Sequence, residues 1–178
     1  MHKNITRREV LSCAIAGCAA ASLLGGQSRV SAEDKKFSVP EGFKGDIKQS
    51  VSKWCFGSYP LAEFCDLCKS MGMVGVDLIN PSDWELVRDC GMTVTMGNVP
   101  EVQIPVGINR KENHDRIVAS YEKYIPIAAE LSVPNLISLS GNCNGMDPQE
   151  GLKNFIEALK RVALIAEKHN VNICMELL

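Results

Sequence analysis

The chain has 178 residues, of which 46% are hydrophobic and 22% are charged, so its composition is that of an ordinary globular protein with enough apolar residues for a core. The formal net charge is -2, with Lys and Arg spread along the chain, and this excludes the basic surface typical of nucleic-acid-binding proteins. We therefore expect no nucleic-acid partner. The length favours one domain, although a complete (β/α)₈ barrel needs about 250 residues.

The N-terminal residues 1–32 are predicted to be an export signal. Arg7 and Arg8 precede an uncharged apolar stretch from Val10 to Leu24, and the small residues around Ala32 offer a cleavage site. The arginine pair favours the twin-arginine route. A membrane-spanning helix needs about 20 apolar residues, and this stretch is shorter. We therefore expect an exported, periplasmic protein that meets the membrane only transiently during export.

A lipid anchor is the alternative reading of the same segment. The residues before Cys18 resemble a lipobox, in which cleavage before the cysteine leaves a lipidated N-terminus. Apolar residues continue beyond Cys18 to Leu24, which favours the twin-arginine reading. A single lipid chain binds membranes only marginally, so even this alternative describes an anchored protein and not a spanning one.

The cysteines outside the signal are predicted to be reduced and structural. An even count in an exported protein invites a disulfide interpretation. Cys65 and Cys68 form a single C-x-x-C within a helical run, without the second pair that a zinc site requires. Cys55 and Cys174 lie in apolar runs, where cysteine behaves as a small hydrophobe. The six cysteines outside the predicted signal are Cys55, Cys65, Cys68, Cys90, Cys143 and Cys174.

Residues 33–50 are polar and rich in Pro and Gly, which predicts a linker into the domain. After the linker, short β-rich runs alternate with amphipathic helical runs. The predicted strands are 51–56, 74–79, 93–96, 135–139 and a fifth strand that ends at Glu176.

The helical runs lie between these strands. Residues 61–70 form the first, and a short helix after Pro81 reaches about Cys90. The third helix has an apolar stripe at helical spacing, formed by Ile117, Tyr121, Tyr124, Ile125, Ala128 and Leu131. The fourth begins with Asp147 as N-cap, followed by Pro148 and Glu150. Its predicted buried face consists of Leu152, Phe155, Ile156, Leu159, Val162 and Ala166.

Alternating strands and helices predict an α/β fold with parallel strands joined by right-handed crossovers. Two architectures fit. One is the N-terminal half of a (β/α)₈ TIM barrel over residues 51–178, truncated after strand 5, and the other is a small doubly wound, flavodoxin-like sheet. No G-x-G-x-x-G follows any strand, which disfavours a dinucleotide-binding sheet. The strand pattern by itself does not choose between the two.

Six segments carry a family resemblance that covers about residues 52–178. They are Lys53–Gly57, Gly72–Leu78, Thr95–Asn98, Gly107–Asp115, Ser140–Asn142 and Cys174–Leu178. In this order and spacing they resemble the hydroxypyruvate isomerase family of xylose-isomerase-like TIM barrel enzymes. The resemblance implies the half-barrel architecture.

The resemblance also implies a metal site. In these isomerases a divalent metal, most often Mg²⁺ or Mn²⁺, lies at the C-terminal mouth of the barrel, held by two glutamates, an aspartate and a His or Gln. The two glutamates also act as the proton-transfer pair. Glu176 matches the first glutamate, so we predict it to be both metal ligand and catalytic residue. The other three ligands are expected from later strands, which this sequence does not contain.

The implied reaction interconverts hydroxypyruvate and tartronate semialdehyde. A base removes a proton next to a carbonyl, and positive charge stabilises the enediolate that forms. Asn98 and Asn142 follow strands, where they can meet a small hydroxy-carbonyl substrate, and Arg110 can pair with its carboxylate. Trp54 is a further substrate-binding candidate, although barrel packing is the commoner role for it.

Three other residues near the strand ends carry open alternatives. Phe56, like Trp54, fits barrel packing better than a substrate wall. Asp77 is expected to end the second strand, where it either faces the mouth or caps the next turn. His114 starts a helix and is expected to be a surface or capping residue.

Two further functions stay open. One is an epimerase or isomerase acting on a larger ketose, and the other is a non-catalytic half-barrel module that needs a partner. A metal-dependent endonuclease is disfavoured by the absence of a basic face. Because the fifth strand is expected to be a bare hydrophobic edge, residues 33–178 alone are predicted to be poorly soluble or homo-oligomeric, and inactive.

Overall fold

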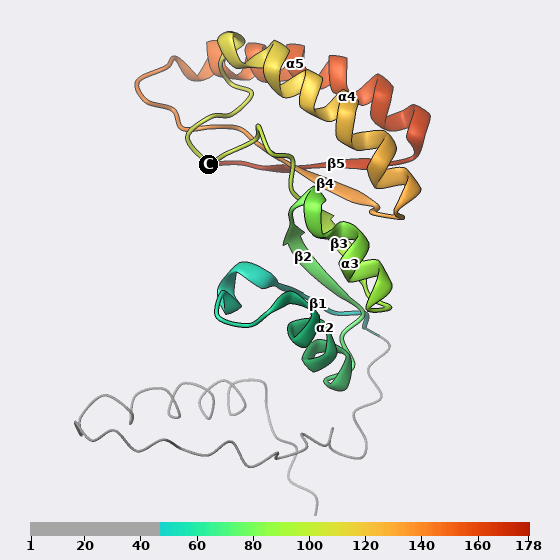
Figure 1. Cartoon of the computed structure of the whole chain (residues 1–178). Coiled ribbons are helices and arrows are strands. Elements are labelled where there is room, and N and C mark those ends of the chain that lie inside the picture. Colours follow the sequence, from blue (N-terminus) through green and yellow to red (C-terminus); the bar gives the residue numbers. More distant parts are fainter. Residues whose placement is uncertain (1–46) are drawn as a thin grey trace, which may run out of the picture. The chain divides into compact units, whose positions relative to one another are not determined.

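The computed structural model describes residues 47–178 (Figure 1). The predicted signal peptide and most of the predicted linker lie outside the described residues. None of the helices within residues 47–178 is long and apolar enough to cross a membrane. The elements are β1 (Ser50–Ser52), η2 (Lys53–Phe56), α2 (Leu61–Ser70), β2 (Gly75–Ile79), η3 (Pro81–Asp83), α3 (Trp84–Asp89), β3 (Thr93–Gly97), η4 (Lys111–Asn113), α4 (His114–Glu130), β4 (Asn135–Leu139), α5 (Pro148–His169) and β5 (Asn172–Glu176).

The five strands form one parallel sheet in the order β1-β2-β3-β4-β5, so every strand pairs with the next one in sequence. A flavodoxin-like sheet has the order 2-1-3-4-5, in which β1 lies inside the sheet. The doubly wound alternative is therefore wrong, and the sequential order is that of an arc of a barrel. The expected α/β fold with parallel strands is confirmed. Figure 1 shows α4 and α5 side by side along β4 and β5.

The hydrophobic core lies on the helix-facing side of the sheet. Val76 and Leu136 are fully buried there, in β2 and β4. Trp84, the first residue of α3, is also fully buried, and its indole nitrogen donates a hydrogen bond to the Ile79 carbonyl at 2.9 Å. A side chain at Gly97 would place its Cβ 2.7 Å from the Trp84 ring, so glycine makes the room that this large ring needs.

The opposite, inner face of the sheet carries a polar belt, made of one residue from each strand. Side chains alternate between the two faces along a strand, which sets these residues apart from the core. Ser50 donates to the Asp77 carboxylate at 2.7 Å, and Thr95 donates to the same carboxylate. Asn135 donates to the Thr95 carbonyl at 2.7 Å, and Asn172 donates to the Asn135 side chain at 3.0 Å. Asp77 thus lies in mid-strand, and its predicted place at the strand end was wrong.

The predicted first strand is too long. Pairing with β2 ends at Ser52, and the next four residues form η2. The aromatic residues of this run leave the sheet: the Phe56 ring lies 5.2 Å from the ring of Phe64 in α2, and Trp54 is 71% exposed. Cys55 of the same run is exposed as well. Apolar residues here pattern like a strand, but they form η2, whose Phe56 packs on α2.

Helix α5 begins as predicted, and its predicted buried face is confirmed in part: Val162 and Ala166 are buried, and Phe155 and Leu159 pack against the core. The Asp147 side chain accepts hydrogen bonds from the backbone N–H groups of Gln149 and Glu150, both at 3.0 Å. Leu152 and Ile156, predicted to be buried, are 51% and 43% exposed. The buried residues are Asn154, Ala158, Val162 and Ala166. Two alanines in this row let α5 approach α4 closely, which a row of larger side chains does not allow.

Helix α4 follows its predicted stripe. Ile117, Tyr121, Ile125 and Ala128 are buried, and the Tyr121 hydroxyl donates to the Ile137 carbonyl at 2.8 Å. Burial raises the pKa of Tyr121 far above its usual range, so this hydroxyl stays protonated and remains a donor.

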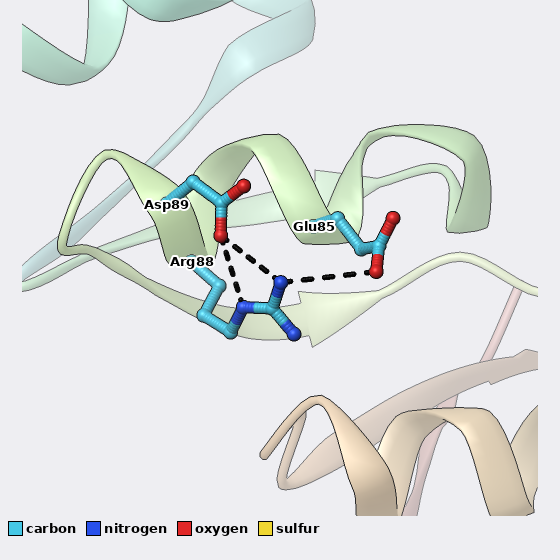
Figure 2. A network of polar contacts seen from close by, with 3 residues as sticks. All are labelled: Glu85, Arg88 and Asp89. Atoms are coloured by element: carbon cyan, nitrogen blue, oxygen red, sulfur yellow. Dashed lines mark hydrogen bonds and ion pairs between the residues drawn. The ribbon is translucent and has the colours of Figure 1, made fainter.

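Charged residues gather on the outer surface of α3 (Figure 2). Arg88 lies between Asp89, 3.0 Å away, and Glu85, 3.7 Å away. All three side chains are about half or more exposed, so solvent screens these ion pairs and they contribute little to stability. These three side chains lie on the solvent-exposed face of α3, away from both faces of the sheet.

Candidate functional site

Glu176 is the last residue of β5 and pairs in register with Leu139 of β4. Strand alternation places its side chain on the same face as Asn172, the β5 member of the polar belt. Its backbone carbonyl accepts a hydrogen bond from Ser140 at 3.1 Å, which fixes the strand end, while the side chain is exposed. The carboxylate therefore stands at the C-terminal edge of the inner face, where parallel barrels place their reacting groups.

Three loop segments meet beside this strand end. They are residues 107–110 before η4, residues 140–146 before α5, and residues 176–178. The Asn109 backbone donates to the Ser140 carbonyl at 3.0 Å, and the Leu178 backbone donates to the Ser140 hydroxyl at 3.0 Å. We call these segments the loop cluster.

Glycine is required where two of these segments touch. A Cβ atom on Gly107 would lie 2.1 Å from the backbone nitrogen of Gly141, closer than any real contact. Gly141 has a φ of +91°, a conformation that side chains rarely adopt. The contact joins residues 34 positions apart, and it holds the loop after β3 against the end of β4.

Asn109, a residue not predicted from the sequence to be functional, organises the loop cluster. Its side-chain nitrogen donates to the carbonyls of Gly141 at 3.2 Å and Asn142 at 3.1 Å. The backbone carbonyl of Asn109 accepts a hydrogen bond from the Asn154 side-chain amide of α5 at 2.9 Å. The signal available in the sequence is a polar residue directly after buried Ile108, within the Gly107–Asp115 segment that carries the family resemblance.

Arg110 and Asn142, two predicted substrate-binding residues, belong to the loop cluster together with Glu176. The Arg110 guanidinium donates to the Cys143 carbonyl at 3.0 Å, and this leaves further N–H groups available. Asn142 is half-buried beside it. The tertiary structure therefore joins these two residues to the end of β5.

Asn98 and Trp54 lie elsewhere. The Asn98 side-chain nitrogen donates to the Leu78 carbonyl at 2.9 Å and to the Asn80 side chain at 3.0 Å, so this nitrogen ties the ends of β2 and β3 together. Trp54 stands exposed on η2, after β1. Asn98 directly follows the end of β3, as predicted, whereas Trp54 lies in η2 beyond the end of β1; neither belongs to the loop cluster.

His114 was expected to be a surface or capping residue, and the surface placement was wrong. The residue is only 4% exposed, and its Nε2 lies 3.0 Å from the Ile108 carbonyl. The ring therefore anchors the loop before η4 to the start of α4. The first residue of a helix is usually solvated, but here the loop folds back over it.

A cavity of about 250 Å³ opens between the loop cluster and the start of α5. Its walls are largely apolar and include Phe155 of α5 and Leu177 and Leu178 after β5. Glu176 does not line it. The cavity adjoins α5, whereas the Glu176 carboxylate belongs to the inner face, so we place the candidate reacting group outside the cavity.

The described residues do not fit a complete metal centre. Within residues 47–178, no group of three or more His, Cys, Asp and Glu side chains lies close enough to hold a metal ion. A hard divalent cation takes about six oxygen ligands, and the Glu176 carboxylate supplies at most two. The Asp77 carboxylate is already engaged by Ser50 and Thr95. Within the described residues, a cation at Glu176 therefore finds no second carboxylate, His or Cys cluster to complete its ligand set.

Comparison with known proteins gives the family. A family model described as "Xylose isomerase-like TIM barrel" matches residues 61–178. The chain belongs to this family. Among curated protein sequences, none matches it.

Solved structures show the same fold at low sequence identity. D-psicose 3-epimerase from Clostridium cellulolyticum H10 is 14% identical with a TM-score of 0.58, covering 74% of this chain and 53% of its own. A sugar phosphate isomerase/epimerase from Parabacteroides distasonis ATCC 8503 is 15% identical with a TM-score of 0.59, covering 80% and 55%.

A third similar structure, the IOLI protein with a bound zinc atom, is 16% identical with a TM-score of 0.59 and covers 74% of this chain and 52% of its own. The chain thus spans about half the length of the solved structures that it matches. Identities this low show the fold alone. The family match and these similar structures confirm the expectation of a partial TIM-barrel-like fold of the xylose isomerase type.

Proposed function

We propose that this protein is a sugar isomerase or epimerase, which moves a proton on a hydroxy-carbonyl substrate with Glu176 as a proton-transfer group. The observation that carries the proposal is the exposed Glu176 carboxylate at the C-terminal edge of the inner face, on the last residue of β5. The names of the similar structures, which include a sugar 3-epimerase and a sugar phosphate isomerase/epimerase, support the reaction class.

The chemistry needs a base beside the carbon next to a carbonyl. The Glu176 carboxylate accepts the proton from that carbon, and an enediolate remains. For an isomerisation, the hydroxyl proton passes to the former carbonyl oxygen and the adjacent carbon takes up the proton, so the carbonyl moves to the first carbon. For an epimerisation, a proton returns to the same carbon from the opposite face. Hydroxypyruvate would lose the proton from its hydroxymethyl carbon and become tartronate semialdehyde.

The loop cluster favours a small, acidic substrate. Arg110 keeps N–H groups beyond the one that it donates to Cys143, and a guanidinium pairs well with a carboxylate. Together with the sequence resemblance, this supports hydroxypyruvate as substrate. The second candidate is epimerisation of a larger ketose, which the similarity to D-psicose 3-epimerase favours.

We propose a divalent cation, Mg²⁺ or Mn²⁺, as the cofactor, with Glu176 as one of its ligands. A bound cation supplies positive charge that stabilises a developing oxyanion. One similar structure holds zinc, which supports metal use in this fold without fixing the metal. Export by the twin-arginine route, periplasmic location and homo-oligomer formation are further proposals that rest on the sequence.

The deciding experiment follows a proton. The protein isolated from its natural source is incubated in deuterated buffer with hydroxypyruvate or with a ketose, in the presence of Mg²⁺ or Mn²⁺. We expect deuterium to enter the carbon next to the carbonyl, and Glu176→Gln to slow this entry by about 10²–10⁴-fold. Glu122→Gln, which changes an exposed carboxylate on α4, is the matched control and should leave the rate unchanged. Equal rates for Glu176→Gln and the wild-type protein would refute the role of Glu176.

A further inference from the structure

The loop after β4 contains the single Asn-Gly pair of the sequence, Asn144 followed by Gly145. The pair forms the tip of a turn in which the Met146 N–H donates to the Cys143 carbonyl at 2.9 Å. Asn144 has a φ of +43° and Gly145 a φ of +76°. Positive φ at both central positions is typical of a type I′ turn, which prefers Asn-Gly. The backbone therefore explains why these two residues are found here.

The turn is held at its base and open at its tip. The Cys143 carbonyl also accepts from the Arg110 guanidinium at 3.0 Å, and the Cys143 thiol donates to the Met146 carbonyl at 3.4 Å. Asn144 and Gly145 are both exposed. Apart from the chain neighbours of Gly145, no atom of the described residues lies within 4 Å of the place where a Cβ on this glycine would stand. Solvent therefore surrounds the pair.

We propose that Asn144 is a site of spontaneous deamidation, which converts it into aspartate or isoaspartate. The backbone nitrogen of Gly145 attacks the side-chain carbonyl carbon of Asn144, and a succinimide ring closes. The amide nitrogen leaves as ammonia and takes with it the proton of the attacking nitrogen. Water then opens the ring, either at the side-chain carbon to give aspartate or at the backbone carbonyl carbon to give isoaspartate. Water is the only co-reactant, so atoms and electrons balance.

The structure favours this reaction at Asn144 because both the glycine and the open tip help it. Ring closure requires the peptide bond after Asn144 to rotate until the Gly145 nitrogen meets the side-chain carbon. Glycine has no Cβ, so its nitrogen is the least hindered and its backbone rotates most freely. At this exposed tip, rotation breaks the hydrogen bond across the turn but displaces no buried side chain.

The modification changes the loop cluster, to which residues 140–146 belong. Either product places a negative charge beside Cys143, whose carbonyl binds the Arg110 guanidinium. Isoaspartate also adds a carbon atom to the main chain between Cys143 and Met146, so the hydrogen bond that closes the turn no longer fits. The proposal concerns a modification site and does not depend on Glu176 or on the sugar chemistry.

The test follows the full chain over time. The protein is incubated at neutral and at alkaline pH, digested, and its peptides are analysed by mass spectrometry. We expect the peptide with Asn144 to gain the mass of an exchange of NH₂ for OH and to separate into two products, faster at alkaline pH because the attacking nitrogen must lose a proton. Asn170 is the internal control: it is also exposed and has a φ of +54°, but Val171 follows it, so it should stay unchanged.

A variant and a short peptide complete the test. Asn144→Gln keeps an amide but needs a larger ring to close, so the mass gain should be lost. A synthetic peptide of residues 140–150 is incubated in parallel. An unchanged Asn144 in the full chain overturns the proposal, and conversion of the peptide alone would show that the folded turn protects the pair. Equal conversion of Asn144 and Asn170 would also overturn it, because Gly145 would then not be the cause. Mapping of the wild-type chain decides among these results even if the variant fails to fold.

Discussion

The two faces of the sheet differ in what they contain. On the helix-facing side, Val76, Leu136 and Trp84 are fully buried beneath the helices. On the inner face, the strands contribute the hydrogen-bonded polar belt, and Glu176 stands exposed at its C-terminal edge. Stability therefore depends mainly on one face, while the other keeps polar groups available for chemistry.

Adjacent residues of one strand make this difference measurable. Leu136 and Ile137 follow each other in β4 but point to opposite faces, and only Leu136 is fully buried. A matched pair of substitutions in β4 can therefore compare the faces within the same backbone environment.

The largest effect is expected on the helix-facing side. Leu136→Ala should lower the free energy of unfolding by about 2–5 kcal/mol, because it leaves a cavity next to the Trp84 ring. Ile137→Ala, on the half-buried inner face, should cost less. Urea denaturation of both variants gives the two values, and an equal or larger cost for Ile137→Ala would break the proposed division between the faces.

A smaller effect is expected at the centre of the polar belt. Asp77→Ala removes the acceptor of both Ser50 and Thr95, so it should cost about 1–3 kcal/mol in a denaturation experiment. Asp89→Ala, which removes an exposed carboxylate paired with Arg88, should cost less than about 1 kcal/mol. If the two variants were equally stable, the belt would be no more than a solvated surface.

The smallest effect is expected outside both faces, at the ion pair of Lys111 and Glu157. Their charged atoms lie 3.0 Å apart, and the hydrogen bond from Lys111 lowers the pKa of Glu157 below its usual 4.5. A lowered folded-state pKa stabilises the protein above about pH 4.5, and this stabilisation is lost as the pH falls through the folded-state value. Melting temperatures of the wild-type protein and Glu157→Gln should converge on acidification, and a constant difference between pH 7 and pH 3 would contradict this pairing.

Local sequence signals determined much of the fold. The helix over residues 61–70 and the strand over residues 135–139 have the predicted bounds, and Asp147 caps α5 as its spacing with Glu150 indicated. Glu176 ends β5 as predicted. These features depend on residues a few positions apart, whose hydrophobic period and capping preference are written into a short stretch of chain.

Only the tertiary structure decided the features that join distant residues. Phe56 lies in η2 beyond the end of β1 and contacts Phe64 of α2. Leu152 and Ile156, at the edge of the predicted α5 face, are exposed, whereas Ala158 is buried. Asn109 became the organiser of the loop cluster because Gly107 and Gly141 bring two loops into contact. The sequence determines a residue's period and local preference, but a contact across many residues exists only once the strands are paired and the helices packed, since its energy depends on the whole arrangement.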